Sequence, residues 1–215
     1  MHDVQGTQVR PDAAGGLREA KKAATRTQLT TAARRLAVEH GLDAVTVEMI
    51  SSAAGVSVRT FFNYFETKDA AVLGPDQAVA PDAAISAFLA GRPTGALLDD
   101  LVALLDPSDQ LAREGRDGVQ QLFDLVSREP RVLAAFLTRG MAHEADVARL
   151  VALRLGLAEP TTACRTVAAA AVTVVRRGYA EWFADPGPAA PLRARIEQAA
   201  RELVALVRPA DPPAD

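Results

Sequence analysis

The stretch TVEMISSAAGVSVRTFFNYFETK, residues 46–68, decides the fold of this chain. It predicts two short helices joined by a tight turn at Gly55, because glycine readily adopts the backbone conformation that such a turn requires. The second helix carries aromatic side chains on one face and polar side chains on the other. This is the layout of a helix-turn-helix, whose second helix lies in the major groove of DNA. The stretch therefore predicts DNA binding.

Hydroxyl residues mark the expected helix starts around this stretch. Thr46, Ser57 and Thr67 each precede a helical pattern, where a hydroxyl can accept a hydrogen bond from a free backbone amide. Upstream, apolar residues recur at the spacing of one helix face until Gly41 ends the pattern. The members of this stripe are Leu29, Ala32, Ala33, Leu36 and Ala37. The caps and the stripe together favour a three-helix helix-turn-helix domain over an ordinary helical hairpin with solvated polar residues.

The outward face of the second helix supplies the candidate DNA contacts. Arg59 lies at the N-terminal end of this helix, where its guanidinium can bind O6 and N7 of a guanine. Lys68 adds its charge to the free amides of the next helix start, which suits a phosphate. The apolar residues expected to pack inward are Val58, Phe61, Phe62 and Phe65, although Val58 can alternatively read a thymine methyl. The predicted DNA-binding residues are Thr46, Ser57, Val58, Arg59, Thr60, Asn63, Tyr64 and Lys68.

Charge is distributed as DNA binding requires, although the formal net charge of the chain is −3. Residues 17–74 hold eight basic and six acidic side chains, so positive charge gathers in the predicted DNA-binding region. Basic residues before the helix-turn-helix can neutralise phosphates or reach a minor groove. The alternative for them is a solvated tail and a charged helix start. They are Arg10, Arg18, Lys21, Lys22 and Arg26.

Composition favours a helical protein of the cytoplasm. Aromatic residues make up 5% of the chain, and alanine and leucine dominate it. Cys164 is the single cysteine, which excludes an intrachain disulfide and a cysteine-based metal cluster. The longest strongly apolar run, residues 167–175, is far shorter than the ~20 residues of a membrane span. No secretion signal is visible, and we expect neither a membrane partner nor a cofactor.

The rest of the chain predicts an all-α architecture. Ala/Leu-rich segments are separated by breaks that contain proline or glycine, and the valine run 172–175 is expected to be helical because it lies inside a long helical pattern. The expected domains are a flexible arm (1–16), a helix-turn-helix domain (17–74), a helical ligand-binding and dimerisation domain (75–208) and a disordered tail (209–215). Helices of the third region are expected at about 82–90, 95–105, 110–127, 131–155, 161–184 and 191–207.

The helix-turn-helix region resembles the DNA-binding domain of TetR-family regulators. The resemblance rests on GLDAVTVE (41–48), AGVS (54–57), TFFNYF (60–65) and Lys68-Asp69, with Ser51 standing where alanine is usual. The resemblance implies that six of the candidate residues contact DNA. They are Ser57, Arg59, Thr60, Asn63, Tyr64 and Lys68. The FFNYF form also resembles a subgroup with an acyl-CoA-type ligand domain, as in mycofactocin-system regulators.

A ligand pocket is expected among the central helices of the C-terminal domain. An arginine in the mostly apolar helix 161–184 could meet an anionic head group, although a surface position or an ion pair is the commoner outcome. The predicted ligand-binding residues are Phe123, Phe136, Met141, Arg176, Tyr179 and Trp182, for each of which a plain core role is the alternative. The last two helices, 161–184 and 191–207, are expected to pair with a second copy as a four-helix bundle.

These observations predict a homodimeric repressor that leaves a palindromic double-stranded DNA operator when a small-molecule inducer, acyl-CoA-like by the resemblance, binds. An activator is one alternative, and a helical small-molecule-binding protein that has lost DNA affinity is another. An enzyme is not expected. The three histidines form no strong ligand spacing, and nucleophile-elbow, P-loop, Rossmann and HExxH motifs are missing from the sequence.

Overall fold

The computed structural model of the chain describes residues 13–76, 78–185 and 191–207, and every regular element within them is helical. The expected tail lies outside these residues, as does most of the expected arm. The chain divides into two compact units, Met1–Pro75 and Asp76–Asp215, and each is described by itself. None of the described helices is long and apolar enough to span a membrane.

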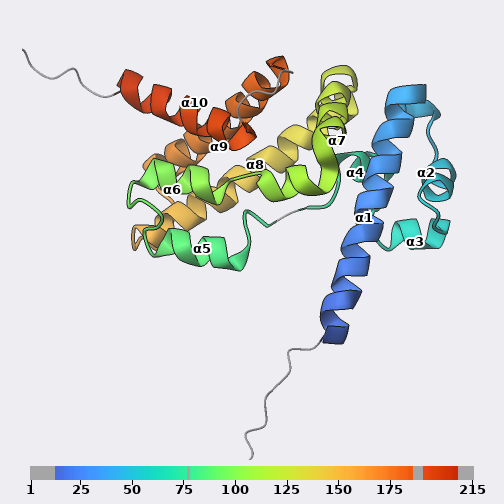
Figure 1. Cartoon of the computed structure of the whole chain (residues 1–215), viewed down its shortest axis with the longest axis horizontal. Helices are drawn as coiled ribbons and strands as arrows, with labels where there is room; N and C mark the ends of the chain where they lie inside the picture. Colours follow the sequence, from blue (N-terminus) through green and yellow to red (C-terminus); the bar gives the residue numbers. More distant parts are fainter. Residues whose placement is uncertain (1–12, 77, 186–190, 208–215) are drawn as a thin grey trace, which may run out of the picture. The chain divides into compact units, whose positions relative to one another are not determined.

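The N-terminal unit is a bundle of short helices packed around one long helix (Figure 1). The long helix begins before residue 17, where the sequence pattern placed its start. The recognition helix ends at Phe62, before Phe65, the last residue of the predicted apolar stripe. The elements are α1 (Ala13–His40), the 3-10 helix η1 (Leu42–Ala44), α2 (Val47–Ala53), α3 (Val58–Phe62) and α4 (Lys68–Leu73).

All three predicted caps are confirmed. The hydroxyl of Thr46 accepts a hydrogen bond from the amide of Met49 at 3.3 Å, and the hydroxyl of Thr67 accepts one from Ala70 at 3.1 Å. Ser57 caps α3 in the same way. Gly55 has a φ of 68°, so the turn between α2 and α3 uses the left-handed backbone that glycine permits. These local interactions set the start of each helix in the motif.

A buried arginine fastens α1 to the end of α4. Arg34 is 1% exposed, and its guanidinium donates from Nε to the carbonyl of Val72 at 2.7 Å and from Nη2 to the carbonyl of Leu73 at 3.3 Å. These carbonyls end a helix, where the backbone dipole favours a cation. The contact therefore joins the first and last helices of the N-terminal unit.

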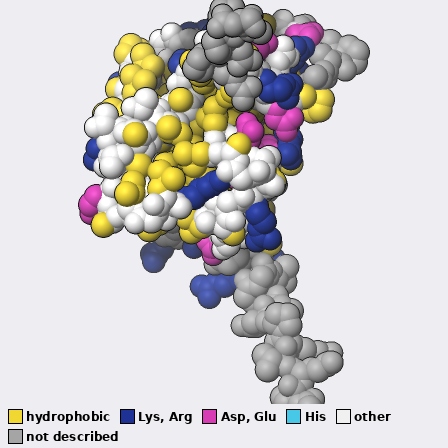
Figure 2. Space-filling model, turned by 90° about the vertical axis from the view of Figure 1, so that its left-hand side faces the viewer, with side chains coloured by type: hydrophobic (Ala, Val, Ile, Leu, Met, Phe, Trp, Pro, Cys, Tyr) yellow, Lys and Arg dark blue, Asp and Glu magenta, His cyan; other side chains and the backbone are white. Residues whose placement is uncertain are grey.

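The C-terminal unit is an α-helical assembly with α9 at its centre, packed against both α8 and α10 (Figure 1). Figure 2 looks onto its side with α5, α6 and α10, over which hydrophobic side chains gather. The helix predictions are confirmed to within a few residues, including the helical valine run. The helices are α5 (Asp82–Leu89), α6 (Leu97–Leu104), α7 (Ser108–Arg128), α8 (Pro130–Arg154), α9 (Thr162–Ala184) and α10 (Leu192–Val207).

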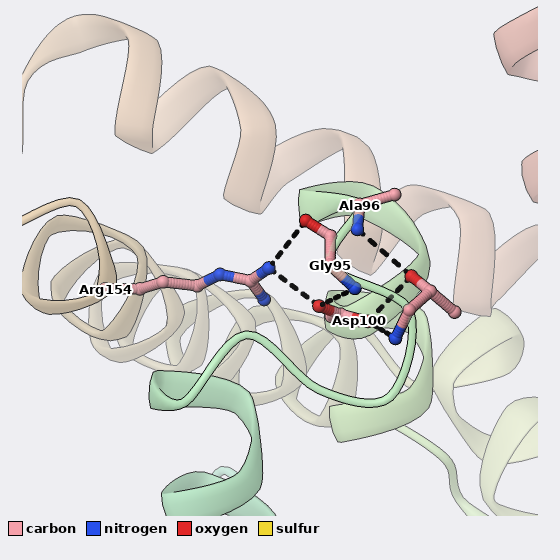
Figure 3. Close-up of polar contacts among 5 residues, drawn as sticks. Gly95, Ala96, Asp100 and Arg154 are labelled. Carbon is pink, nitrogen blue, oxygen red and sulfur yellow. Dashed lines mark hydrogen bonds and ion pairs between the residues drawn. The ribbon is translucent and has the colours of Figure 1, made fainter.

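A buried ion pair holds the α5–α6 loop against the end of α8 (Figure 3). The carboxylate of Asp100 accepts hydrogen bonds from the amide and hydroxyl of Thr94, at 2.7 and 2.8 Å, and from the amide of Gly95 at 3.2 Å. Arg154 donates to the same carboxylate at 2.6 Å and lies over the ring of Phe88. The Asp100 carboxylate therefore joins two backbone amides of the loop to the guanidinium at the end of α8.

Helices α9 and α10 meet at a glycine. A Cβ added at Gly178 would lie 2.8 Å from Cα and 2.9 Å from the backbone nitrogen of Ile196, closer than packed atoms allow. Leu192 and Ile196 of α10, a helix that the sequence predicted to pair with a second copy, are buried against α9 within the chain. The C-terminal end of α10 remains open, with Leu206 85% and Val207 70% exposed.

Helix α7 is bent at Gly115, whose φ of 69° and ψ of 169° are not helical. Its two parts point in clearly different directions (Figure 1). A Cβ at Gly115 would find no heavy atom within 4 Å, so no neighbouring atom occupies the space beside this residue. The bend depends on a backbone conformation that glycine adopts without steric cost.

Candidate functional site

A basic surface forms where the start of α1 lies beside α3. A shallow hollow of about 690 Å³ is lined by both helices. Cationic side chains enter from α1, and polar and aromatic side chains enter from the end of α3 and the residues after it. The lining residues are Arg18, Lys21, Lys22, Thr25, Thr60, Asn63 and Tyr64. This arrangement suits a polyanion, because cations and hydrogen-bonding groups share one surface.

The predicted reading residues of α3 face outward. Arg59 and Asn63 are exposed, while Val58, Thr60 and Tyr64 are half-buried. The hydroxyls of Ser57 and Thr60 lie 2.8 Å apart, and Ser57 also accepts the amide of Thr60 at 3.0 Å. The start of the recognition helix is therefore held in one conformation, which favours specific contacts with base edges.

Tyr64 is tied to α1 by a cation–π contact. The Arg26 guanidinium lies 5.7 Å from the centre of the Tyr64 ring. Such a contact contributes about 0.5–1 kcal/mol at an exposed site. It places the phenol beside the basic residues of α1, so two groups that the sequence treated separately belong to one surface.

The Lys68 ammonium, which the sequence predicted to hold a phosphate, makes its contacts within the N-terminal unit. Its Nζ donates to the carbonyls of Leu42 and Val45, both at 2.7 Å, and to that of Asp43 at 3.3 Å. An ammonium has three N–H groups, so these carbonyls use all of them. Lys68 instead joins the start of α4 to η1. Its backbone amide, in the first turn of α4, remains a candidate for a phosphate contact.

Replacing Lys68 with methionine is expected to lower the free energy of unfolding of the N-terminal unit by about 2 kcal/mol, because hydrogen bonds from a charged group are lost. Urea unfolding measures this change. Lys22→Met is the matched control, since Lys22 is exposed and lines the basic hollow. That control should keep its stability and reduce the salt dependence of DNA binding by about one phosphate contact. If Lys68→Met instead kept its stability and reduced the salt dependence of DNA binding, Lys68 would be a phosphate contact.

Phe62 is a surface residue that the sequence placed in the core. It is 55% exposed and touches the fully buried Phe61 edge to face, with ring centroids 5.4 Å apart. Only Phe61 and Phe65 of the predicted aromatic stripe are buried. Phe62 is the last residue of α3, and its exposed ring is available to contact a thymine methyl or a sugar. The sequence pattern missed this exposure because helical periodicity does not show that α3 ends at Phe62.

Four predicted ligand-binding residues come together in the C-terminal unit. Phe123 of α7 lies 6.2 Å from Phe136 of α8 and 5.8 Å from Tyr179 of α9, measured between ring centroids. Trp182 joins through Phe183, at 5.2 Å. We call these five residues the ring cluster. Burial raises the pKa of Tyr179 above its usual range, and the charges of Glu114 and Asp106 raise it further, so the phenol is neutral and can donate a hydrogen bond.

The other two predicted ligand residues do not join the ring cluster. Met141 is 74% exposed on α8. Arg176 is exposed on α9, because it lies on the face of that helix opposite the buried Val174 and Gly178. The geometry therefore gives Arg176 no inward orientation toward an anionic head group, and solvent takes the place of the expected pocket at Met141.

Known proteins resemble both units. Residues 29–73 match the model of the tetR family of bacterial regulatory proteins, and residues 101–208 match the MftR C-terminal domain. The HTH-type transcriptional regulator TcmR of Streptomyces glaucescens is 35% identical over 162 residues, which cover 72% of this chain and 70% of TcmR.

A solved structure of FadR from Thermus thermophilus, a TetR-family repressor in complex with lauroyl-CoA, is 21% identical and covers 88% of this chain and 98% of its own. Its TM-score of 0.31 is too low for any feature to be carried over. The two domain matches and the TcmR relationship agree with the helix-turn-helix geometry and the all-helical C-terminal unit. The chain belongs to the tetR family of bacterial regulatory proteins and carries an MftR-type C-terminal domain.

Proposed function

We propose that the chain is a dimeric repressor that binds a palindromic DNA operator and leaves it when a small molecule binds the C-terminal unit. The basic surface shared by α1 and α3 is the observation that carries this proposal. Lysines and arginines of α1 supply the electrostatic part of binding, and Arg59, Thr60 and Asn63 supply base contacts. Thr46, Ser57, Val58 and Tyr64 remain proposed contacts at the edges of this surface.

Dimerisation follows from the size of the reading element. Helix α3 spans only Val58–Phe62, so one copy offers few base contacts. Two copies related by a two-fold axis would read two half-sites of one operator. The exposed Leu206 and Val207 at the end of α10 offer apolar surface that a second copy could cover.

The proposed inducer acts through a difference in affinity. A ligand can release DNA only if it binds the DNA-incompetent conformation more tightly than the competent one. The ring cluster is the proposed ligand site, and an acyl-CoA-like inducer was the expectation from the family resemblance. The function needs binding rather than catalysis, and its DNA target places the protein in the cytoplasm. An activator would bind DNA through the same surface and differ only in the transcriptional outcome.

Arg59→Ala is expected to weaken binding to the preferred fragment by about 1–3 kcal/mol, because one base-reading side chain is lost. Fluorescence anisotropy with fragments from around the protein's own gene measures this change at several salt concentrations. Arg177→Ala is the control, since Arg177 is exposed on α9 and pairs with Glu181. It should bind as the unaltered protein does. The absence of fragment-selective binding at low salt would contradict the proposal, and the absence of any binding would favour a helical ligand-binding protein without DNA function.

A further inference from the structure

A groove lies between α6 and α10 in the C-terminal unit. The two helices pack side by side (Figure 1), and the groove between them has a volume of about 260 Å³. Its floor is apolar and contains the buried side chains of Val102, Ile196 and Ala200. None of the ring-cluster residues lines this groove, so it is a different place from the proposed inducer site.

The two helices run in opposite directions along the groove. Arg193, at the start of α10, pairs with Asp106, which follows the end of α6, at 3.5 Å. The lining residues recur on one face of each helix, over about two helical turns. The start of α6 therefore faces the later part of α10. Asp99 of α6 and Arg201 of α10, which both line the groove, lie at the same end of it.

The charges at the Arg193 end of the groove have partners within the chain. Nε of Arg193 donates to the carboxylate of Glu197 at 2.9 Å, and Nη1 pairs with Asp106. The carboxylate of Asp106 also accepts hydrogen bonds from the amide and the hydroxyl of Ser108, at 3.0 and 2.6 Å. This end of the groove therefore needs no ligand to balance its charges.

The charges at the other end of the groove differ in this respect. Asp99 and Arg201 are exposed, and within the described part of the chain neither makes an ion pair or a hydrogen bond, with the other or with a third residue. One carboxylate and one guanidinium thus lie at the same end of an apolar groove. This pattern is complementary to a small molecule that carries both charges next to an apolar chain.

We propose that the groove between α6 and α10 binds an aliphatic α-amino acid. The carboxylate of Asp99 accepts hydrogen bonds from its ammonium, and the guanidinium of Arg201 donates to its carboxylate. The aliphatic side chain covers the apolar floor and leaves water. Pockets for drug-sized ligands have volumes of about 300–1,000 Å³, so the smaller groove favours a small metabolite over an acyl-CoA. The site goes beyond the function proposed above, because neither the DNA-binding surface nor the ring cluster contributes to it.

Titration calorimetry of the full chain tests the proposal with L-leucine as the probe. The comparison ligands are 4-methylpentanoate, which lacks the ammonium of leucine, and 3-methylbutylamine, which lacks its carboxylate. We expect saturable binding of one L-leucine per chain and at least tenfold weaker binding of each comparison ligand. No saturable binding of L-leucine, or equally tight binding of either single-charge ligand, would overturn the proposal.

Charge-removing variants test which residues hold the two ends of the amino acid. Asp99→Asn and Arg201→Gln should each weaken the binding of L-leucine at least tenfold. The matched controls are Asp117→Asn and Arg128→Gln, which remove exposed charges of α7 outside the groove and should bind L-leucine as the unaltered chain does. Unchanged binding by either groove variant, or equal loss in the controls, would overturn the assignment. Circular dichroism confirms that each variant is folded.

Ala103→Leu tests the apolar part of the groove without changing its charge. Ala103 is half-buried and lines the groove from α6, so a leucine there would fill part of the space that the ligand side chain needs. Binding of L-leucine should weaken at least fivefold. The control is Ala112→Leu, at an exposed residue of α7 outside the groove, which should leave binding unchanged. Unchanged binding by a folded Ala103→Leu variant would contradict the proposed position of the aliphatic side chain.

Discussion

Gly178→Ala is expected to lower the free energy of unfolding of the C-terminal unit by about 3 kcal/mol, at the upper end of the range for overpacking. The added methyl group would meet the Cα and backbone nitrogen of Ile196, and a backbone cannot move aside by changing rotamer. Helices α9 and α10 would have to separate along their contact. Thermal and urea unfolding, followed by circular dichroism, measure the loss.

Gly140→Ala is the matched control for this substitution. Gly140 also lies inside a helix, α8, and a Cβ there would find no heavy atom within 4 Å. This change should stabilise the unit by about 0.4–1 kcal/mol, because alanine loses less backbone entropy on folding. Similar behaviour of the two variants would show that α9 and α10 do not pack as closely as described.

Asp100→Asn is expected to lower the free energy of unfolding of the C-terminal unit by about 3–5 kcal/mol, the range seen when one partner of a buried ion pair is removed. The guanidinium of Arg154, whose side chain is 9% exposed, would keep its charge without the carboxylate that balances it. The loop amide of Thr94 would also compete for a weaker acceptor. Asp99→Asn, at the exposed neighbouring residue, should change stability by less than about 0.5 kcal/mol.

The same carboxylate makes stability depend on pH. Burial tends to raise the pKa of Asp100, but hydrogen bonds from Thr94 and the charge and hydrogen bond of Arg154 outweigh it and hold the pKa below its usual value. This stabilisation is therefore complete above the pKa of the unfolded chain and is lost as pH falls through the lower folded pKa. Asp100→Asn should unfold with a smaller dependence on acid pH. An unchanged acid profile would contradict the role of the carboxylate.

Features determined by neighbouring residues could be predicted from the sequence. Thr46, Ser57 and Thr67 cap helices that begin within three residues of them, and the turn at Gly55 depends on its own backbone angles. The boundaries of the C-terminal helices follow from proline and glycine chemistry in the same way. Each signal lies within a few residues of the structure that it predicts.

Roles that depend on distant partners could not be predicted. Lys68 bonds carbonyls up to 26 residues away, Arg34 bonds a carbonyl 38 residues away, and Asp100 pairs with a residue 54 positions later. In the sequence a lysine at a helix start looks like a phosphate ligand, and only the position of η1 shows that its protons are already used. The prediction that Phe62 is buried was wrong for a related reason, because periodicity does not show where a helix ends.

The ring cluster lies between these two cases. Four of its five members, all but Phe183, were predicted from the sequence, but their convergence depends on how α7, α8 and α9 pack. Arg116, which lies over Trp182, escaped notice because it is an ordinary charged residue in a polar helix. Arg176 was favoured instead for its apolar neighbours, although a helix with apolar residues on one side still exposes the other.

Protection of guanine N7 from dimethyl sulfate tests most directly whether α3 reads the major groove. The full chain is bound to a selected genomic fragment, and methylation is mapped at saturating protein. We predict protected guanines in two symmetric half-sites, with protection lost in Arg59→Ala at a concentration that restores full occupancy. Full reactivity of every guanine N7 on a saturated fragment would contradict this account.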